Sequence, residues 1–322
     1  RAVAGRPGLC GTTSKRCPRH MGTTQDPGAV FNMLWAGNNQ LFSEIAAQFP
    51  DRAATAFTVG VGLAMLAAQC ALSAYFSFVA TSGPWHAMPG FTAHQLIYFP
   101  VALYTAYIGC AGWFGSSAST PAERILGEVA TGLHLAQLQL AILLFWDIPT
   151  GLVVKTLRDP VMLGHHVGFA LTALAVTQSC NTYYALCFFG VVELSSIPLC
   201  FADVFHPRRK AYCAWLESAP ITRALNDAVR ALFVLSYMLV RALYFPYVVW
   251  GCYVPDMRAV LLLPLSQRKG QSNGALWLPV FLGTPFALLQ LWWGSLLVKQ
   301  LRKMMQSPLT LTLTLNPNPN PN

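Results

Sequence analysis

The chain has 322 residues, of which 54% are hydrophobic and only 10% are charged, and its net charge is +9. A soluble globular domain carries about 25% charged residues, so this composition excludes an ordinary water-facing fold. The basic residues are scattered at the ends of apolar segments, with no dense cluster larger than HPRRK at 206–210. This distribution indicates membrane topology and contact with lipid headgroups, and no nucleic acid is expected as a partner.

The two ends of the chain are expected to lie outside the transmembrane part. Residues 1–30 are rich in Gly, Thr, Arg and Pro, which predicts a disordered segment. Residues 31–56 include FNMLWAGNNQLFSEIAAQF, a pattern typical of an amphipathic segment that lies on the membrane surface. Residues 304–322 end in TLTLTLNPNPNPN, a low-complexity repeat that predicts a disordered tail.

Seven apolar blocks are long enough to cross a bilayer, which takes about 20 residues. They are predicted at 57–80, 94–114, 129–149, 161–180, 182–204, 228–251 and 276–299. A backbone in lipid must satisfy its hydrogen bonds internally, and helices do so. The sequence therefore predicts an all-α fold, a polytopic membrane helical bundle of about seven transmembrane helices, which forms one domain over 57–303.

Basic residues are distributed unequally between the two sets of loops. The loops after the third and fifth blocks and the segment after the seventh hold most of them: Lys155, Arg158, Arg208, Arg209, Lys210, Arg223, Lys299, Arg302 and Lys303. The opposite set holds Arg124, Arg258, Arg268 and Lys269. By the positive-inside rule, the C-terminus is predicted to be cytosolic and the N-terminus to be lumenal or outside.

Ionisable side chains within apolar blocks are costly in lipid, so each is a candidate functional residue. They are His134, Asp147, His165, His166, Glu193, Asp227, Arg230 and Arg241. Asp147 ends its block and also fits a plain interfacial position. Asp227 and Arg230 are three residues apart and are expected to pair near the membrane surface. We interpret His134 as a satisfied polar residue.

The adjacent residues His165 and His166 lie in RDPVMLGHHVGFAL, where their side chains diverge by about 100° around a helix. One ring is expected to face the bundle interior while the other meets a neighbouring helix. The alternative is that both are solvated near the membrane interface. No further ligands stand at metal-binding spacings, and the nine cysteines form no CxxC pair, so no metal site is predicted.

Glu193 lies near the middle of the fifth block, where a carboxylate must be neutral, paired or facing a wet cavity. Arg241, deep in the sixth block, is the expected counter-ion. The alternative is a buried ion pair that only fixes the register of two helices. Pro246 is expected to kink the sixth helix and to free backbone groups near the cavity.

Four segments, in this order, resemble the TLC domain family, the membrane domain shared by the translocation-associated membrane protein, the ceramide synthases and a neuronal lipofuscinosis protein. They are LLFWDIP with Asp147, RDPVMLGHHVGFAL with the double histidine, VVELSSIPL with Glu193, and VLSYMLVRALYFPY with Arg241 and Pro246. Glu193 follows His166 by 27 residues, the spacing that the resemblance leads us to expect. The resemblance covers 57–303.

For the ceramide synthases, the resemblance implies transfer of an acyl group from acyl-CoA to the amine of a sphingoid base. That reaction uses the double-histidine helix and an Asp-x-x-Asp pair on the next helix. Here Glu193 and Ser196 occupy the places of the two aspartates, so the second carboxylate is missing. The chain thus resembles the non-synthase branch, which is linked to membrane lipid composition. The resemblance also implies the endoplasmic reticulum or another endomembrane, with the plasma membrane as an alternative.

Two functions are therefore expected as alternatives, both without a cofactor. In the first, the protein binds lipids or regulates membrane lipid composition without catalysis. In the second, it is an acyl-CoA-dependent N-acyltransferase that acts on a sphingoid base, with His165 or His166 as general base and Glu193 orienting it. A transporter is disfavoured, because no paired broken helices suggest an inverted repeat. In either case a polar cavity is expected to be lined by Asp147, His165, His166, Glu193, Ser196 and Arg241.

Overall fold

The structure is a computed structural model that describes residues 52–177 and 180–306. The expectations for residues 1–30, for most of 31–56 and for most of the 304–322 tail lie outside the described residues. The first described residues belong to a helix that begins at Arg52, and the last described helix ends at Gln306.

Every regular element in the described part of the chain is a helix, so the predicted all-α class is confirmed. Most segments are α-helical, η1, η3 and η4 are π-helical, and η2 and η5 are 3₁₀-helical. The elements are α2 (Arg52–Phe78), α3 (Pro84–Ala87), α4 (Pro89–Gly115), α5 (Pro121–Leu126), α6 (Ala130–Ile142), η1 (Leu143–Asp147), α7 (Ile148–Val153), α8 (Pro160–Val176), α9 (Thr182–Phe188), η2 (Val191–Ser195), α10 (Ser196–Val204), α11 (Lys210–Glu217), α12 (Pro220–Ser236), η3 (Tyr237–Tyr244), α13 (Phe245–Tyr247), η4 (Val248–Tyr253), α14 (Val254–Leu261), η5 (Leu265–Gln267) and α15 (Asn273–Gln306).

Six helical stretches in the described residues are long and apolar enough to cross a membrane. They are Ala54–Phe78, Pro89–Gly115, Ala130–Val153, Thr182–Val204, Pro220–Leu261 and Leu276–Lys303. The remaining predicted span, 161–180, is the shorter apolar helix α8, which has 17 residues and stops at Val176. The next helix, α9, begins at Thr182 directly after Asn181, whose φ is 64°. At about 1.5 Å per residue, α8 covers most of the hydrocarbon layer.

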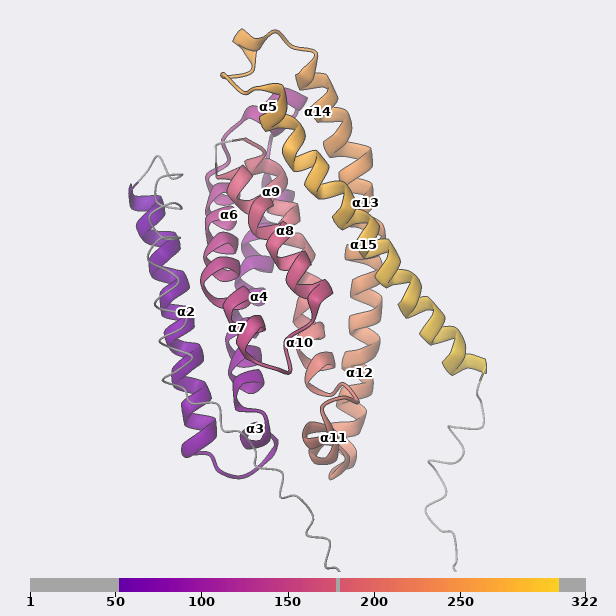
Figure 1. Cartoon of the computed structure of the whole chain (residues 1–322). Coiled ribbons are helices and arrows are strands. Elements are labelled where there is room, and N and C mark those ends of the chain that lie inside the picture. Colours follow the sequence, from indigo (N-terminus) through magenta and orange to yellow (C-terminus); the bar gives the residue numbers. More distant parts are fainter. Residues whose placement is uncertain (1–51, 178–179, 307–322) are drawn as a thin grey trace, which may run out of the picture.

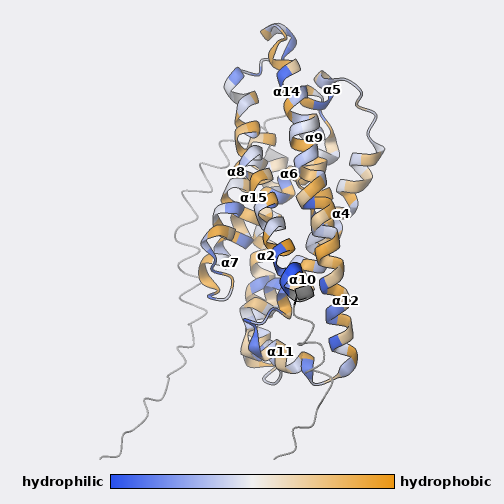
Figure 2. Cartoon of the chain, turned by 90° about the vertical axis from the view of Figure 1, so that its right-hand side faces the viewer, coloured by the Kyte–Doolittle hydropathy of each residue, from blue (hydrophilic) through white to orange (hydrophobic). Residues whose placement is uncertain are grey.

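The outer surface of the bundle is the surface of a membrane protein. Large apolar side chains are widely exposed on it, among them Tyr107 (73%), Phe114 (72%) and Phe281 (75%). Figure 2 shows hydrophobic residues along most of the long helices, with hydrophilic residues more frequent around α11. Such a surface is stable in lipid and unstable in water, so the chain is an integral multi-pass membrane protein.

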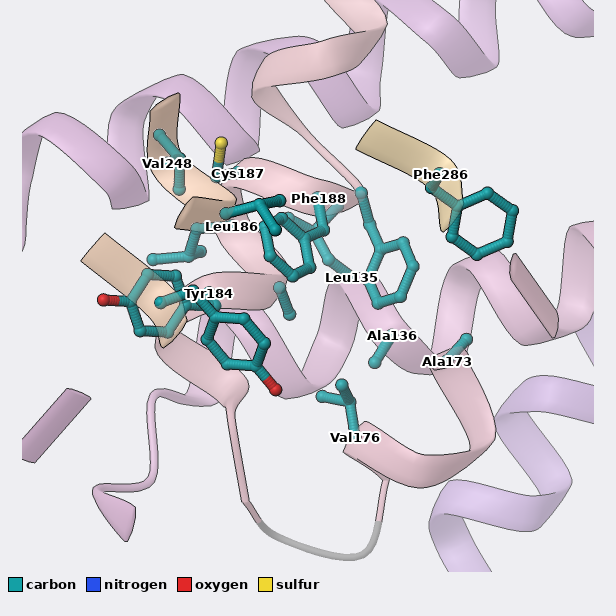
Figure 3. Close-up of a cluster of buried hydrophobic side chains, with 14 of the residues drawn as sticks. Leu135, Ala136, Ala173, Val176, Tyr184, Leu186, Cys187, Phe188, Val248 and Phe286 are labelled. Atoms are coloured by element: carbon teal, nitrogen blue, oxygen red, sulfur yellow. The ribbon is translucent and has the colours of Figure 1, made fainter. Parts of the chain in front are cut away.

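The core is built around α9, which packs against α4, α5 and α6. Figure 3 shows part of the core, where side chains of α6, α8, α9, η4 and α15 meet. At one edge of the bundle α2 packs against α4 and α6, and at the other edge α15 packs against α8, η3 and α14 (Figure 1). The polar side chains within the bundle are therefore enclosed between these two outer helices.

Prolines explain why two of the transmembrane helices, Ala130–Val153 and Pro220–Leu261, widen into π turns at three places. Each π segment ends two residues before a proline: η1 before Pro149, η3 before Pro246 and η4 before Pro255. A proline lacks the N–H that would bond the carbonyl four residues earlier, and its ring clashes with that carbonyl. A wider turn accommodates the ring, so the distortion expected at Pro246 is present as π turns on both of its sides.

The fifth span is interrupted, which the sequence did not lead us to expect. The α-helix α9 ends at Phe188, and 3₁₀ segment η2 follows after Gly190. A Cβ on Gly190 would lie 2.4 Å from the Cα of Gly109 in α4, so two glycines are needed for this approach. Gln139 of α6 donates to the carbonyl of Phe189 at 3.4 Å and so satisfies a group that the interruption frees.

Candidate functional site

A cavity of about 70 Å³ lies inside the bundle, between α4, α6–η1, α8, η2–α10 and η3. The structure brings all six residues of the predicted cavity into its lining: Asp147, His165, His166, Glu193, Ser196 and Arg241. Other lining residues are Tyr98, Val101, Thr105, Gln139, Ile142, Leu143, Met162, Phe169 and Leu199. The polar candidates, which are far apart in the sequence, therefore face one shared space between the helices.

Glu193 and Arg241 form an ion pair at one side of the cavity. The Oε1 atom of Glu193 lies 3.7 Å from Nη2 of Arg241, and both side chains are about 10% exposed. The hydroxyl of Tyr98 donates to Oε2 of Glu193 at 2.9 Å. Arg241 donates through Nε to Ser195 Oγ at 2.7 Å and through Nη2 to Ser196 Oγ at 2.6 Å. In addition to this ion pair, each charged group has hydrogen-bond partners of its own, as buried charges require.

Asp147 lies at the other side of the cavity, between two imidazoles. Its Oδ1 atom is 2.9 Å from Nε2 of His94 in α4, and its Oδ2 atom is 3.1 Å from Nδ1 of His166 in α8. The Asp147 side chain is about 10% exposed. The alternative that Asp147 is a plain interfacial residue does not describe this position, because the carboxylate is enclosed by three helices.

His165 has a different environment from its neighbour. Its ring packs against Phe169 at 4.6 Å between centroids, and against Phe286 and Trp293 of α15 at 5.2 and 5.6 Å. Its Nδ1 atom is buried and has no hydrogen-bond partner among the described residues. As expected from their divergence on the helix, the two histidines meet different helices, α15 for His165 and η1 for His166, and both still line the cavity.

All three charged residues of the cavity stand on segments that are not α-helical. Asp147 ends the π segment η1, Glu193 lies in the 3₁₀ segment η2, and Arg241 lies in the π segment η3. Short π and 3₁₀ segments inside α-helices are frequent at functional sites, because they turn one side chain out of the regular helical series. The local distortions caused by prolines and glycines are therefore what aim these charges inward.

Sequence reasoning missed three residues of this polar network: His94, Tyr98 and Ser195. His94 carried a usable signal, since it is an ionisable residue at the start of the second apolar block and the cost of such residues in lipid applies to it as well. Tyr98 and Ser195 carried no signal, because tyrosines and serines are common at many positions in membrane helices.

Three further candidates, His134, Asp227 and Arg230, are not among the residues that line the cavity. His134 Nε2 meets the Tyr104 hydroxyl at 3.2 Å, which fits its interpretation as a satisfied polar residue. The predicted pair of Asp227 and Arg230 is wrong: Arg230 donates to Asn226 Oδ1 at 3.0 Å and to the carbonyl of Phe205 at 2.5 Å. Asn226 lies four residues before Arg230, which is about one helical turn, and its side chain rather than that of Asp227 meets the guanidinium group.

A second hollow, of about 100 Å³, lies on the other side of α8 and is almost wholly apolar. It is lined by Leu140, Leu144, Ile148, Val167, Ala170, Leu171 and Leu174. Val167 and Leu171 are about half exposed, so this hollow faces the lipid phase. In the described ranges, no group of three or more His, Cys, Asp or Glu side chains has a geometry that could hold a metal ion.

A family model, described as the TLC domain, matches residues 65–299 of the chain. No curated protein and no solved structure matches the chain. The matched region contains every charged residue of the cavity and both of its adjacent histidines, and it lies within the 57–303 range of the predicted domain. The resemblance based on four ordered segments is confirmed, and the chain belongs to the TLC domain family.

Proposed function

We propose that this protein binds the headgroup of a membrane lipid in its interior cavity and thereby influences membrane lipid composition without catalysing a reaction. The observation that carries this proposal is the convergence of Asp147, Glu193, Arg241 and two imidazoles on one space between apolar helices that are long enough to cross a membrane. Ionisable groups are expensive at such a position and are retained where they serve a ligand or an ion.

The charges indicate the chemistry of the headgroup. Two carboxylates and one guanidinium line the cavity, so with neutral imidazoles the lining carries one excess negative charge. The guanidinium already donates to Ser195 and Ser196. What the cavity offers to a ligand is therefore mainly hydrogen-bond acceptors, which suit an amine or hydroxyl headgroup better than a phosphate.

The size of the cavity limits how a lipid would bind. A volume of about 70 Å³ has room for a few water molecules, each of which needs roughly 10–15 Å³. A small polar group fits there, and an acyl chain does not. The acyl chains of the ligand would remain in the bilayer, for which the apolar hollow beside α8 offers a contact surface.

The test is to purify the wild type and Glu193→Ala and to identify co-purifying lipids by mass spectrometry. His134→Ala is the matched control, because His134 lies in a transmembrane helix away from the cavity. We expect an amine- or hydroxyl-bearing lipid to be enriched with the wild type and the control and lost with Glu193→Ala. Cells that lack the protein should show a modest shift in the same lipid class. Equal lipid profiles for all three proteins would contradict the proposal.

Acyl-CoA-dependent N-acyl transfer is a second candidate, favoured by one observation. Asp147 and His166 are 3.1 Å apart, which is the arrangement of an oriented general base. Against it, Ser196 stands where the second carboxylate of the ceramide synthase pattern is expected, and its hydroxyl is already engaged by Arg241. Purified protein supplied with acyl-CoA and a sphingoid base decides the matter: ceramide formation that is abolished by His166→Ala would replace the first proposal with this one.

The compartment is also part of the proposal. Membership of the TLC family supports the endoplasmic reticulum or another endomembrane. Fluorescence microscopy of the tagged full chain with organelle markers tests this, and plasma-membrane staining would contradict it.

A further inference from the structure

We propose that His94 is a positioning residue, which holds Asp147 so that His166, rather than His165, presents a free imidazole nitrogen to the cavity. The inference deepens the proposed function, because it names the atom that would accept a hydrogen bond from the headgroup. It rests on that function for the identity of the ligand only. The arrangement of the three side chains can be tested by itself.

The argument begins with the carboxylate, which only accepts hydrogen bonds. His94 Nε2 is hydrogen-bonded to Oδ1 at 2.9 Å, and His166 Nδ1 lies within ion-pair distance of Oδ2, at 3.1 Å. A nitrogen lone pair this close to a carboxylate oxygen would be repelled by it, so each of these two nitrogens carries a hydrogen atom. A neutral imidazole has one N–H and one acceptor nitrogen. With its proton fixed at Nδ1, neutral His166 keeps Nε2 as an acceptor. Asp147 thus selects the tautomer of His166, as second partners of histidines commonly do.

His94 does not pass protons further along this chain. Its other nitrogen, Nδ1, is buried and has no partner among the described residues. Its ring is stacked on Trp146, with 4.7 Å between centroids and 17° between the planes, and Trp146 is fully buried. Tyr98 lies over it at 6.0 Å. A ring held in this way fixes the direction of its single hydrogen bond, and so fixes the Asp147 carboxylate.

The contrast with His165 shows why the two adjacent histidines are not equivalent. His165 is surrounded by Phe169, Phe286 and Trp293, and no carboxylate lies within ion-pair distance of it in the described ranges. Nothing among these contacts selects its tautomer. The His165 ring therefore only lines the cavity, whereas His166 presents Nε2 as a hydrogen-bond acceptor in a fixed orientation.

Other charged groups face the same space, and they do not replace the carboxylate. Glu193 accepts from Tyr98 and is paired with Arg241, and the Arg241 guanidinium donates to two serines. In the described chain, Asp147 is the acid within ion-pair distance of His166. If Asp147 loses its orientation, the tautomer of His166 should therefore change.

The test compares His94→Phe with His94→Gln in lipid nanodiscs. Phenylalanine keeps a ring on Trp146 but removes the donor to Asp147, whereas the glutamine amide can still donate. Nitrogen-15 NMR of labelled histidines should show His166 protonated at Nδ1 and free at Nε2 in the wild type. We expect a mixture of tautomers in His94→Phe and a return to the wild-type form in His94→Gln. A role of His94 in packing alone would give the opposite order of the two variants.

Lipid retention supplies the second readout, with His134→Phe as the matched control. A lost hydrogen bond to a charged group corresponds to about a tenfold change, so we expect about tenfold less bound lipid with His94→Phe and near wild-type binding with His94→Gln. If the wild type binds no lipid, the proposed function fails, while the tautomer experiment still tests His94. If His94→Phe does not fold, Asp147→Asn takes its place, since an amide that donates should invert the tautomer of His166. An unchanged His166 spectrum in His94→Phe, or in Asp147→Asn where that variant replaces it, overturns the inference.

Discussion

Each charged side chain in the cavity is held by groups from other helices. Arg241 joins η3 to η2 through Glu193 and Ser195 and to α10 through Ser196. Asp147 joins η1 to α4 and α8. Hydrogen bonds of this kind specify direction as well as contact, because the donors and acceptors must point at each other. The positions of the cavity side chains therefore depend on residues of other helices, which the sequence around each side chain does not predict.

Replacing Arg241 should be costly, and the cost should depend on Glu193. Arg241→Met leaves a buried carboxylate and two serine hydroxyls without their cation, and removing one partner of a buried pair costs about 3–5 kcal/mol. Glu193→Gln in the same chain should recover part of this loss. The free energy of unfolding in detergent or nanodiscs measures both effects. Exposed Arg258 supplies the control variant, Arg258→Met, and an Arg241→Met cost no larger than that of the control would contradict the ion pair.

Glu123, outside the spans, gives a prediction for pH. Its Oε2 atom accepts from the backbone N–H groups of Thr120 and Ser119 at 2.9 and 2.8 Å, and these bonds lower its pKa from about 4.5 to about 2. Since the folded-state pKa is depressed, the stabilisation of α5 by this capping box is present above pH 4.5. It is lost as the pH falls through about 2.

Carbon-13 NMR of the Glu123 carboxyl in nanodiscs should therefore give a titration midpoint near pH 2. Ser119→Ala, which removes the hydroxyl that also donates to Glu123 at 3.0 Å, should raise that midpoint towards the ordinary value. A wild-type midpoint at 4.5 would show that the capping box does not form.

A cavity residue could be predicted from the sequence where its own type was unusual for its place in an apolar block. Asp147, His165, His166, Glu193 and Arg241 are ionisable residues in apolar blocks, and that cost is visible in a single residue. The residues that hydrogen-bond to them could not be predicted in this way. Tyr98 and Ser195 are ordinary helix residues until the fold brings them to Glu193 and Arg241, and no local pattern marks them.

At the scale of the helix, apolar composition predicted where the chain crosses the membrane but not where each helix ends. The sixth span was predicted at 228–251, and the helix runs from Pro220 to Leu261. Hydropathy detects the most apolar part, whereas the whole helix has 42 residues and is longer than the roughly 30 Å hydrocarbon layer is thick. The fourth was predicted to reach residue 180, but at the turn the Asn181 N–H donates to the carbonyl of Ile125 at 2.7 Å, a long-range contact that composition does not encode.

The close approach of α4 and η2 makes a testable element-scale prediction. A Cβ on Gly109 would lie 2.3 Å from the Cα of Gly190, which is backbone and cannot yield as a side chain does. Gly109→Ala should force the two elements apart, at a cost of about 1–3 kcal/mol, and should displace Glu193 with η2. The free energy of unfolding in detergent and the amount of retained lipid should both decline.

Gly60 offers a matched control for that substitution. It lies within α2, and a Cβ there would meet nothing within 4 Å. Gly60→Ala should be neutral or stabilising, because alanine favours a helix over glycine by about 1 kcal/mol. If the two substitutions had the same effect, the Gly109–Gly190 contact would not limit the packing of the bundle.

At the scale of the whole molecule, most of the basic residues in the loops between spans lie at one end of the bundle. The helices α2 and α4 run in opposite directions, and each later span up to α15 runs opposite to the span before it (Figure 1). The loops near 155–158 and 206–210 and the end of α15 therefore share one side. The positive-inside rule predicts that this side is cytosolic.

Glycosylation-site tags test this topology. Tags after Lys303 and in the loop at 79–83 should stay unmodified, whereas a tag in the segment 116–120 should be modified. Modification of either of the first two tags would reverse the assignment. A tag at 116–120 that also stays unmodified would show a failure of the tag or a different number of crossings, which a tag at 268–272 on the same side resolves.

The π segments make the bundle unevenly sensitive to changes in chain length. An α-helix turns by about 100° per residue, so a deletion within α6 would rotate all that follows and carry Asp147 from the cavity towards lipid. A π turn holds one residue more than the same stretch of α-helix, so a deletion within Leu143–Asp147 would let the turn tighten while α6 and α7 kept their faces. The bundle would then survive with its acidic group displaced. Deletion of one residue within this π segment could therefore remove the polar cavity in a single evolutionary step and leave the rest of the bundle intact.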